Sequence, residues 1–202
     1  MTETVRIGDY DFRKNNIYYF NSVIFSQFDS FQRSVRQKRI HYPSDPLLLV
    51  LNSPGGSSWI NFYLEDLMDE GIVTLGFDLV ASIAMDFLQV GEKRYSYPLT
   101  RFMIHTAILG DYNSTTGRIE NGRTMTQEDE ANCLYPGHPI LAERSGKSEY
   151  EIRKMCKIET WMSPIEAKSV GFIDDIVNVP TELVGKLRQK PKGSIGFIKT
   201  KY

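Results

Sequence analysis

Ser82 and His105 are the residues whose types and positions could carry out nucleophilic catalysis. A serine hydroxyl is a poor nucleophile at neutral pH and needs a base, most often histidine, to take its proton. Each residue follows an apolar run typical of a strand, over 72–77 and 102–104. The carboxyl ends of parallel strands meet at one edge of a sheet, so we expect the two side chains there. The pair indicates a serine hydrolase.

Two turns near these residues could bind the oxyanion of an acyl transfer. Gly55 and Gly56 end the segment Asn-Ser-Pro-Gly-Gly, and their missing side chains would let a substrate carbonyl approach main-chain N–H groups. The N–H groups of Ser82 and Ile83 stand at the start of an expected helix, whose positive end favours negative charge. These turns predict an anion-binding site beside the nucleophile.

Each of these signals also has an ordinary structural interpretation. A serine within Ala-Ser-Ile-Ala is more often a helix cap than a nucleophile. A histidine that ends a strand is more often structural, and Asn-Ser-Pro-Gly-Gly is by itself a common turn. The occurrence of all three at strand ends favours a catalytic site.

Strand and helix patterns alternate along the chain. We expect strands over residues 17–20, 47–51, 72–77, 94–97, 102–105 and 172–177. We expect helices over 25–38, 58–70, 82–90, 140–144 and 148–157, and one more that starts after Ser163 and ends at Gly171. The polar stretch 124–130 could support a further helix. Ser148 with Glu151 and Ser163 with Glu166 form capping boxes. Alternation with short connections predicts an α/β fold with a mainly parallel sheet.

Composition limits the classes of function. A chain of 202 residues with a net charge of −1 favours one domain and offers no basic surface for nucleic acid or an anionic membrane. Cys133 and Cys156 are too few for a disulfide framework, which favours a reducing compartment such as the cytoplasm. The first 20 residues lack a signal-peptide pattern, and no run reaches the roughly 18 apolar residues of a membrane span.

Between Ile17 and Val177 the chain resembles ClpP, the proteolytic subunit of the ATP-dependent Clp protease. The motifs that carry the resemblance are Asn52–Gly56, Ala81-Ser82 with Phe87-Leu88, Arg101–His105, Leu141–Gly146, and Met162–Ala167 leading into Gly171–Asp174.

The resemblance implies a crotonase-like α/β fold with a mainly parallel sheet, βα repeats and a handle region at about 111–145. It implies one peptidase domain over 1–180. The lysines and arginines of residues 181–202 predict a basic tail, longer than the family usually has, that either binds a partner or is solvated. The resemblance further implies heptameric rings, stacked in pairs or mixed with similar subunits, a polypeptide substrate and neither cofactor nor metal. Docking of an AAA+ unfoldase stays open, because only 16 residues precede the first expected strand.

By position, the resemblance makes Ser82 the nucleophile, His105 the general base, and the N–H groups of Gly56 and Ile83 the oxyanion hole. The triad acid falls on Glu159, where the family usually has aspartate. Glutamate is one methylene longer, yet it can orient a histidine in other hydrolases. The alternative is that Glu159 is a solvated surface residue.

Departures from the family pattern keep a second function open. Asp78 and Ala84 stand where the family has glycines near the nucleophile, and Ile158 replaces an arginine that pairs across the ring interface. A weakly active or inactive structural ring subunit, similar to ClpR, is therefore the alternative to an active serine peptidase. A third possibility is an acyl-thioester enzyme of the crotonase fold, against which Ser82 and His105 argue.

Overall fold

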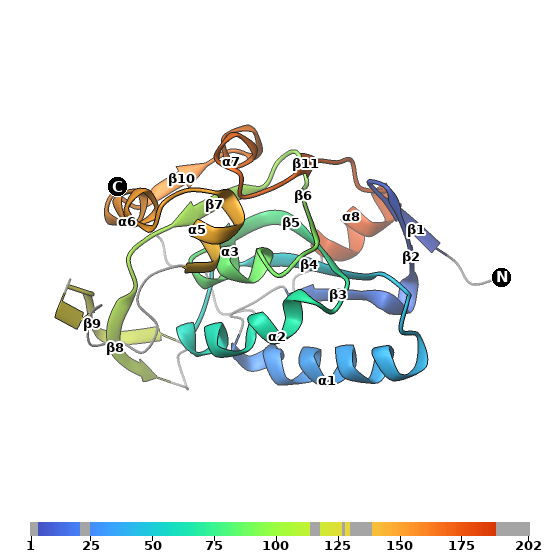
Figure 1. Ribbon diagram of the computed structural model, residues 1–202, viewed down its shortest axis with the longest axis horizontal. Coiled ribbons are helices and arrows are strands. Elements are labelled where there is room, and N and C mark those ends of the chain that lie inside the picture. Colours follow the sequence, from blue (N-terminus) through green and yellow to red (C-terminus); the bar gives the residue numbers. More distant parts are fainter. Residues whose placement is uncertain (1–3, 21–24, 114–117, 127, 130–138, 189–202) are drawn as a thin grey trace.

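A mainly parallel sheet forms the centre of the molecule in the computed structural model, which describes residues 4–20, 25–113, 118–126, 128–129 and 139–188 (Figure 1). Within these ranges its strand order is β10-β7-β5-β4-β3, with β6 joined to β5 and β11 joined to β6. Among the described strands of this sheet, only β10 runs antiparallel to its neighbour. The strands are β3 (Ile17–Phe20), β4 (Leu47–Ser53), β5 (Ile72–Ala81), β6 (Lys93–Ser96), β7 (Arg101–Ile104), β10 (Thr160–Met162) and β11 (Asp175–Ile176). The predicted α/β fold with a mainly parallel sheet is confirmed.

Strand β5 changes its neighbour halfway along. Its first part pairs with β6 as far as Gly76, and its last part pairs with β7 from Leu79 to Ala81. The register with β4 shifts over the same stretch, where Asp78 is exposed and has a φ of 62°. Irregularities of this kind bend and twist a strand. The carboxyl end of β5 therefore lies beside the carboxyl end of β7.

Strand β4 is buried on both faces. Leu47, Leu49 and Leu51 belong to one apolar cluster, together with residues of α1 (Phe25–His41) and α3 (Ile83–Leu88). Leu48 and Val50 belong to a second cluster on the other face. Because successive side chains of a strand point to opposite faces, a continuous apolar run is what two-sided burial requires.

Three further helices contribute to the apolar cluster on the first face, and one of them, α5 (Pro139–Ser145), packs against α3 (Figure 1). The other two are α6 (Glu149–Lys157) and α7 (Pro164–Val170). Both predicted capping boxes are present, at the starts of α6 and α7, and Gly171 ends α7 with a φ of 91°. Among the described helices, none is long and apolar enough to cross a bilayer.

The second face of the sheet is covered by a hairpin and a helix that are not among the elements predicted from the sequence. The hairpin β1 (Thr4–Ile7) and β2 (Tyr10–Arg13) buries Ile7 and Phe12, and α8 (Thr181–Arg188) buries Leu183 and Leu187. Strands of four residues carry too few alternations to stand out, and α8 lies in what the sequence suggests is a solvated tail. Residues 189–202 of that tail lie outside the described residues.

The helix predicted over 58–70 is wrong. The structure has a 3₁₀ turn, η2 (Ser58–Tyr63), followed by a single helical turn, α2 (Glu65–Met68). Leu64 and Leu67 are buried as expected, but Tyr63 is 46% exposed rather than inward-facing. Aromatic and β-branched residues lose rotamer freedom in an α-helix, which disfavours a regular helix over this aromatic segment.

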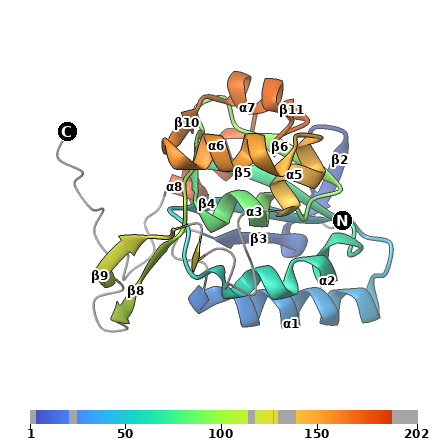
Figure 2. The ribbon, with the colours of Figure 1, turned by 60° about the vertical axis from the view of Figure 1, so that its left-hand side comes forward.

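The structure also refines the predictions for residues 172–177 and for the handle region. The strand expected over 172–177 is limited to β11, because Phe172 and Ile173 are buried in the turn that precedes it. In the predicted handle region, β8 (Ile108–Asn113) and β9 (Arg118–Thr124) form a hairpin that projects from the body (Figure 2). Thr124 therefore ends a strand, whereas Glu128 and Asp129 are helical, as the helix considered for 124–130 requires; residues 127 and 130 lie outside the described part.

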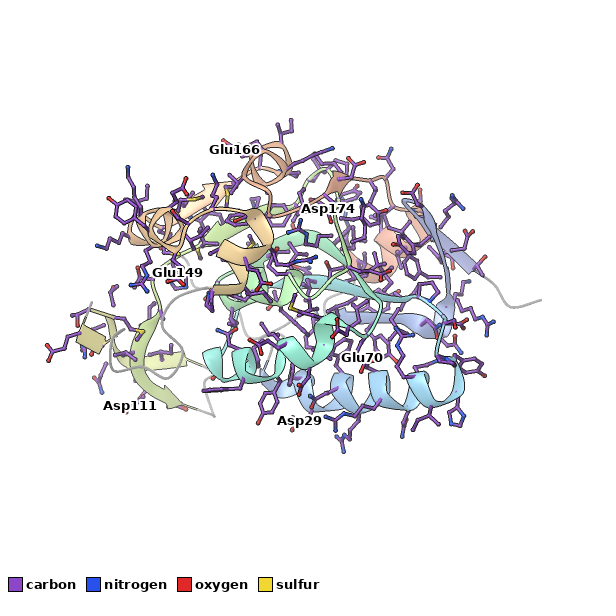
Figure 3. The ribbon with its side chains drawn as sticks, viewed as in Figure 1. Asp29, Glu70, Asp111, Glu149, Glu166 and Asp174 are labelled. Carbon is purple, nitrogen blue, oxygen red and sulfur yellow. The ribbon has the colours of Figure 1, made fainter. Side chains whose placement is uncertain are left out.

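A buried polar network links the end of α3 to the turn between α7 and β11. Arg94 donates through Nη1 to Gln89 Oε1 (2.7 Å) and to the Gly171 carbonyl (2.9 Å). It also donates through Nη2 to Asp174 Oδ1 and through its backbone N–H to Asp174 Oδ2, both at 2.7 Å. Asp174 is labelled in Figure 3. Since Gln89 lies directly after α3, the network helps to fix the helix that follows Ser82.

Replacing Arg94 with methionine should lower the free energy of unfolding at pH 7 by about 2 kcal/mol, because the partly buried carboxylate of Asp174 would lose its charged hydrogen-bond partner. Burial alone would raise the pKa of Asp174, but the hydrogen bonds and charge of Arg94 outweigh it and lower that pKa. Asp174 therefore stabilises the fold above about pH 4, and this stabilisation is lost as the pH falls through the lowered pKa. Urea unfolding at pH 7 and pH 3 measures both effects.

Lys168→Met is the matched control, since Lys168 pairs with Asp175 at 2.7 Å while both side chains are about half exposed. This exposed pair should contribute little. Equal destabilisation by the two substitutions would contradict the role given to the buried network.

Candidate active site

Ser82 occupies a sharp turn between β5 and α3. Its φ of 56° and ψ of −133° are unusual for a residue other than glycine. The turn is held from both sides, because the Ser82 N–H donates to the Met103 carbonyl (2.9 Å) and the Met85 N–H donates to the Ser82 carbonyl (2.8 Å). A strained strand-to-helix turn of this kind lifts a serine side chain out of the surrounding backbone.

His105 follows β7 directly and lies beside Ser82. Ala81 is in register with Met103, so the residues after these two strands are neighbours at one edge of the sheet. His105 Nε2 lies 2.8 Å from Ser82 Oγ, within hydrogen-bond distance. Both side chains are partly exposed, as groups that meet a substrate must be. The structure therefore brings the predicted nucleophile and base together.

The glycine turn packs directly against Ser82. Gly55 has a φ of 112°, and a Cβ at this position would lie 2.7 Å from Ser82 Cβ and 2.9 Å from the Ala81 carbonyl oxygen. The turn is fixed from within by Ser53, whose buried hydroxyl accepts a hydrogen bond from the Gly55 N–H (3.1 Å). Only glycine fits this approach. Ser53 has no role in the predicted site, although a serine two residues before a glycine is a known turn signal.

The two predicted oxyanion donors flank the nucleophile. Gly56 follows the tight Gly55 position and is exposed, and Ile83 is the first residue of α3. The first N–H groups of a helix have no acceptor within that helix. Gly56 is thus next in the chain to the glycine that packs against Ser82, and Ile83 is next in the chain to Ser82 itself.

Glu159 is the neighbour of His105 in the strand register, but its carboxylate is hydrogen-bonded to another residue. Thr160 is in register with Ile104, so Glu159 and His105 stand one residue beyond the same end of the β10–β7 ladder. Glu159 is exposed, has a φ of 49°, and accepts a hydrogen bond from Trp161 Nε1 at 3.1 Å. Among the hydrogen bonds between described residues, its carboxylate is joined to Trp161 and not to His105. The sequence contains no signal that would have predicted this contact.

Asp78 and Ala84, at which glycines were expected, occupy different environments. Asp78 is exposed on the irregular part of β5, where water screens its charge. Ala84 is fully buried within α3 and belongs to the apolar core. Alanine favours helix more than glycine does, so Ala84 suits the helix that follows Ser82.

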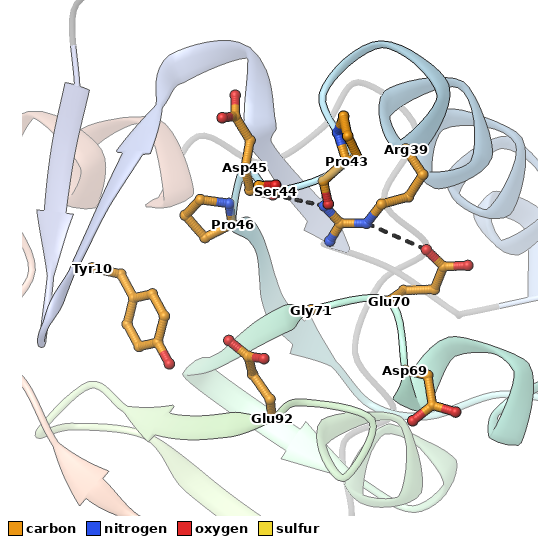
Figure 4. Close-up of a pocket in the computed structure, with 10 residues that line it drawn as sticks. All are labelled: Tyr10, Arg39, Pro43, Ser44, Asp45, Pro46, Asp69, Glu70, Gly71 and Glu92. Carbon is orange, nitrogen blue, oxygen red and sulfur yellow. Dashed lines mark hydrogen bonds and ion pairs between the residues drawn. The ribbon is translucent and has the colours of Figure 1, made fainter.

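A pocket of about 360 Å³ lies at the other end of the central strands (Figure 4). It is lined by residues that precede β4 and β5, including Pro46 and Gly71, whereas Ser82 follows β5. Arg39 forms part of the pocket wall. Its Nε pairs with Glu70 at 3.3 Å, and its Nη1 donates to the Asp45 carbonyl at 2.8 Å. These contacts tie α1 to the loops before both strands, and the pocket is separate from the Ser82 region.

Among the described residues, no three His, Cys, Asp or Glu side chains gather in a way that could hold a metal ion. Cys156 is a buried free thiol, and Cys133 lies outside the described residues.

The residues of the candidate site lie in the part of the chain that is similar to known proteins. The Clp protease family profile matches residues 39–180, which include Gly55, Ser82, His105 and Glu159. ATP-dependent Clp protease proteolytic subunit 2 of Tropheryma whipplei is 30% identical over 139 residues, covering 66% of this chain and 74% of that protein. Proteolytic subunit 1 of Corynebacterium jeikeium is 28% identical over 145 residues, covering 69% of this chain and 74% of that protein.

A solved structure of a ClpP1 mutant from Listeria monocytogenes has the same fold. It aligns with a TM-score of 0.62 at 20% identity and covers 84% of this chain and 95% of that one. The two chains therefore share one overall fold.

Proposed function

The chain belongs to the Clp protease family, and from this premise we propose that it is a serine peptidase subunit that cleaves unfolded proteins or peptides. The family is one of serine proteases. The observation that carries the proposal for this chain is the 2.8 Å contact between His105 Nε2 and Ser82 Oγ.

In the proposed reaction, Ser82 Oγ attacks the carbonyl carbon of the scissile peptide bond while His105 Nε2 takes the hydroxyl proton. The N–H groups of Gly56 and Ile83 stabilise the oxyanion. His105 then gives the proton to the leaving amine, the C–N bond breaks, and an acyl ester remains on Ser82. Water, deprotonated by His105, hydrolyses that ester and restores the serine.

Glu159 is our candidate for the acid that orients His105 and stabilises its charged form. Its position one residue beyond the β10–β7 ladder supports this role, because cross-strand neighbours stand close enough to interact. We also propose ring assembly, alone or with similar subunits, in a cytoplasmic compartment as is typical of the family. An AAA+ unfoldase remains a candidate partner.

A fluorophosphonate probe tests the proposal directly. The pure full-length protein should be labelled covalently, and peptide mapping should find the label on Ser82. The particle mass in solution should be measured on the same sample, because assembly can be needed for activity. Absence of labelling on Ser82 in an assembled particle would contradict the proposed function.

A second candidate function is a weakly active or regulatory ring subunit. The hydrogen bond between Glu159 and Trp161 favours it, since that contact leaves the carboxylate turned toward Trp161. Vigorous peptide hydrolysis by the isolated protein, abolished by Ser82→Ala, would exclude this alternative.

A further inference from the structure

Two adjacent glycines make the turn after β4 accessible and also free to rotate. Gly55 and Gly56 lack the Cβ that restricts φ and ψ, and Gly55 has a φ of 112°, which other residues rarely adopt. The peptide between the two glycines could therefore turn over at little cost. Its N–H group is the Gly56 donor proposed for the oxyanion hole, so that donor needs a contact that keeps the peptide in one orientation.

Ser53 contacts the main chain on both sides of Gly55. Its hydroxyl accepts a hydrogen bond from the Gly55 N–H at 3.1 Å and donates to the Gly55 carbonyl oxygen at 3.3 Å. A serine hydroxyl can donate one hydrogen bond while it accepts another. Ser53 is fully buried, so water does not compete for these bonds. The side chain thus bridges the two peptides that flank Gly55.

The contact with the Gly55 carbonyl decides where the Gly56 N–H points. These two groups belong to one planar trans peptide, in which the carbonyl and the N–H point in opposite directions. The carbonyl oxygen is directed at the buried Ser53, so the N–H is directed away from it. Gly56 is exposed, whereas Ser53 and Gly55 are buried. The Gly56 N–H therefore points away from the interior of the protein.

Ser53 is itself fixed relative to the nucleophile. It is the last residue of β4 and is in register with Val80 of β5, close in the chain to Ser82. Main-chain pairing between the two strands therefore sets the distance between the base of the glycine turn and the start of the Ser82 turn. From this fixed base, the Ser53 hydroxyl can restrain rotation of the peptide between the glycines.

We propose that Ser53 is a positioning residue that holds the Gly55–Gly56 peptide with its N–H turned toward the oxyanion formed at Ser82. This inference rests on the proposed function and deepens it. Without the hydroxyl, the peptide would be divided between two orientations, and one of them withdraws the donor. The loss would weaken the transition state, in which the oxyanion forms, and would not weaken substrate binding.

The kinetic test compares kcat with KM. Ser53→Ala should lower kcat for a fluorogenic peptide about 10-fold while KM stays near that of the wild type, and fluorophosphonate labelling of Ser82 should slow in parallel. The loss should stay below the roughly 10²- to 10³-fold cost of removing an oxyanion donor outright, because the Gly56 N–H remains and is misdirected for part of the time.

Ser96→Ala is the matched control. Ser96 is also a fully buried serine at the end of a strand, and its hydroxyl donates to the Tyr97 carbonyl at 2.9 Å. It lies on β6, which pairs with β5 as far as Gly76, well before Ser82. Its replacement should lower the melting temperature about as much as Ser53→Ala does, yet leave kcat unchanged. An equal loss of kcat in the two variants, or a raised KM as the main effect of Ser53→Ala, would overturn the inference.

Hydrogen exchange tests the contact without using activity. Mass spectrometry of the segment that contains Gly55 should show its amide exchanging at least about 10-fold faster in Ser53→Ala than in the wild type, because its acceptor is removed. Ser96→Ala should leave this exchange unchanged. Exchange in Ser53→Ala that matched the wild type would contradict the role of Ser53, whatever the rates of hydrolysis.

The outcomes separate this inference from the proposed function. Labelling of the wild type at Ser82, with an unchanged kcat in Ser53→Ala, would contradict the role of Ser53 and leave the peptidase proposal intact. No labelling of any variant, the wild type included, would contradict both proposals. Faster exchange at Gly55 would then still show that Ser53 holds the turn.

Discussion

Replacing Ser82 with alanine should lower peptide hydrolysis by about 10⁴- to 10⁶-fold and abolish fluorophosphonate labelling, because no other described group is placed to form the acyl intermediate at this site. His105→Gln should be nearly as severe, since the hydroxyl 2.8 Å from Nε2 would lose its base. The two losses should not multiply in the double variant, because the residues act as one unit. Steady-state rates on a fluorogenic peptide measure all three variants.

Ser169→Ala is a suitable control for these substitutions. Ser169 is exposed on α7 and its hydroxyl donates to the Glu166 carbonyl, at 2.7 Å, so its removal should leave the rate unchanged. Circular dichroism and thermal melting should show that every variant remains folded. Hydrolysis by Ser82→Ala within tenfold of the wild type would place the chemistry elsewhere.

The nucleophile and base could be predicted because local sequence determines both their positions and their chemistry. Each follows an apolar run that forms a central strand, and adjacent parallel strands end at the same edge of the sheet. The continuous leucines of β4 also indicated correctly that the sheet is covered on both faces. Neither inference needed knowledge of distant contacts.

The partner of Glu159 could not be predicted in this way. It depends on the register between β10 and β7, on the positive φ of Glu159 and on the orientation of the Trp161 indole, none of which has a local sequence signal. The same reason applies to α8, whose Leu183 and Leu187 become core residues only because the second face of the sheet is open to them. Tertiary contacts, rather than propensity, decide such positions.

The bend in β5 explains why the unusual Asp78 is compatible with the site. The irregularity around Asp78 allows β5 to leave β6 and join β7, and this change of neighbour places Ser82 beside His105. Left-handed backbone is uncommon for most residues, but aspartate tolerates it better than bulky side chains do. The substitution thus keeps the strand geometry that the site needs while placing the added charge in solvent.

Gly55→Ala should reduce peptide hydrolysis by at least about 10²-fold in a protein that still folds. The new methyl carbon would lie 2.7 Å from Ser82 Cβ and 2.9 Å from the Ala81 carbonyl oxygen, and its φ of 112° is rarely adopted by alanine. Either the glycine turn or Ser82 must move, and a displacement of about 1 Å at a catalytic group typically costs two orders of magnitude in rate. Fluorophosphonate labelling of Ser82 should slow in parallel, because the serine itself is displaced.

Gly146→Ala separates this clash from the general cost of replacing a glycine. Gly146 has a φ of 70°, but a Cβ there would meet nothing within 4 Å, so alanine should impose backbone strain of about 1–2 kcal/mol and no displacement of the site. Its melting temperature should fall while its hydrolysis rate per folded molecule stays near that of the wild type. If Gly55→Ala behaved in the same way, the close packing of the glycine turn on Ser82 would not be what positions the nucleophile.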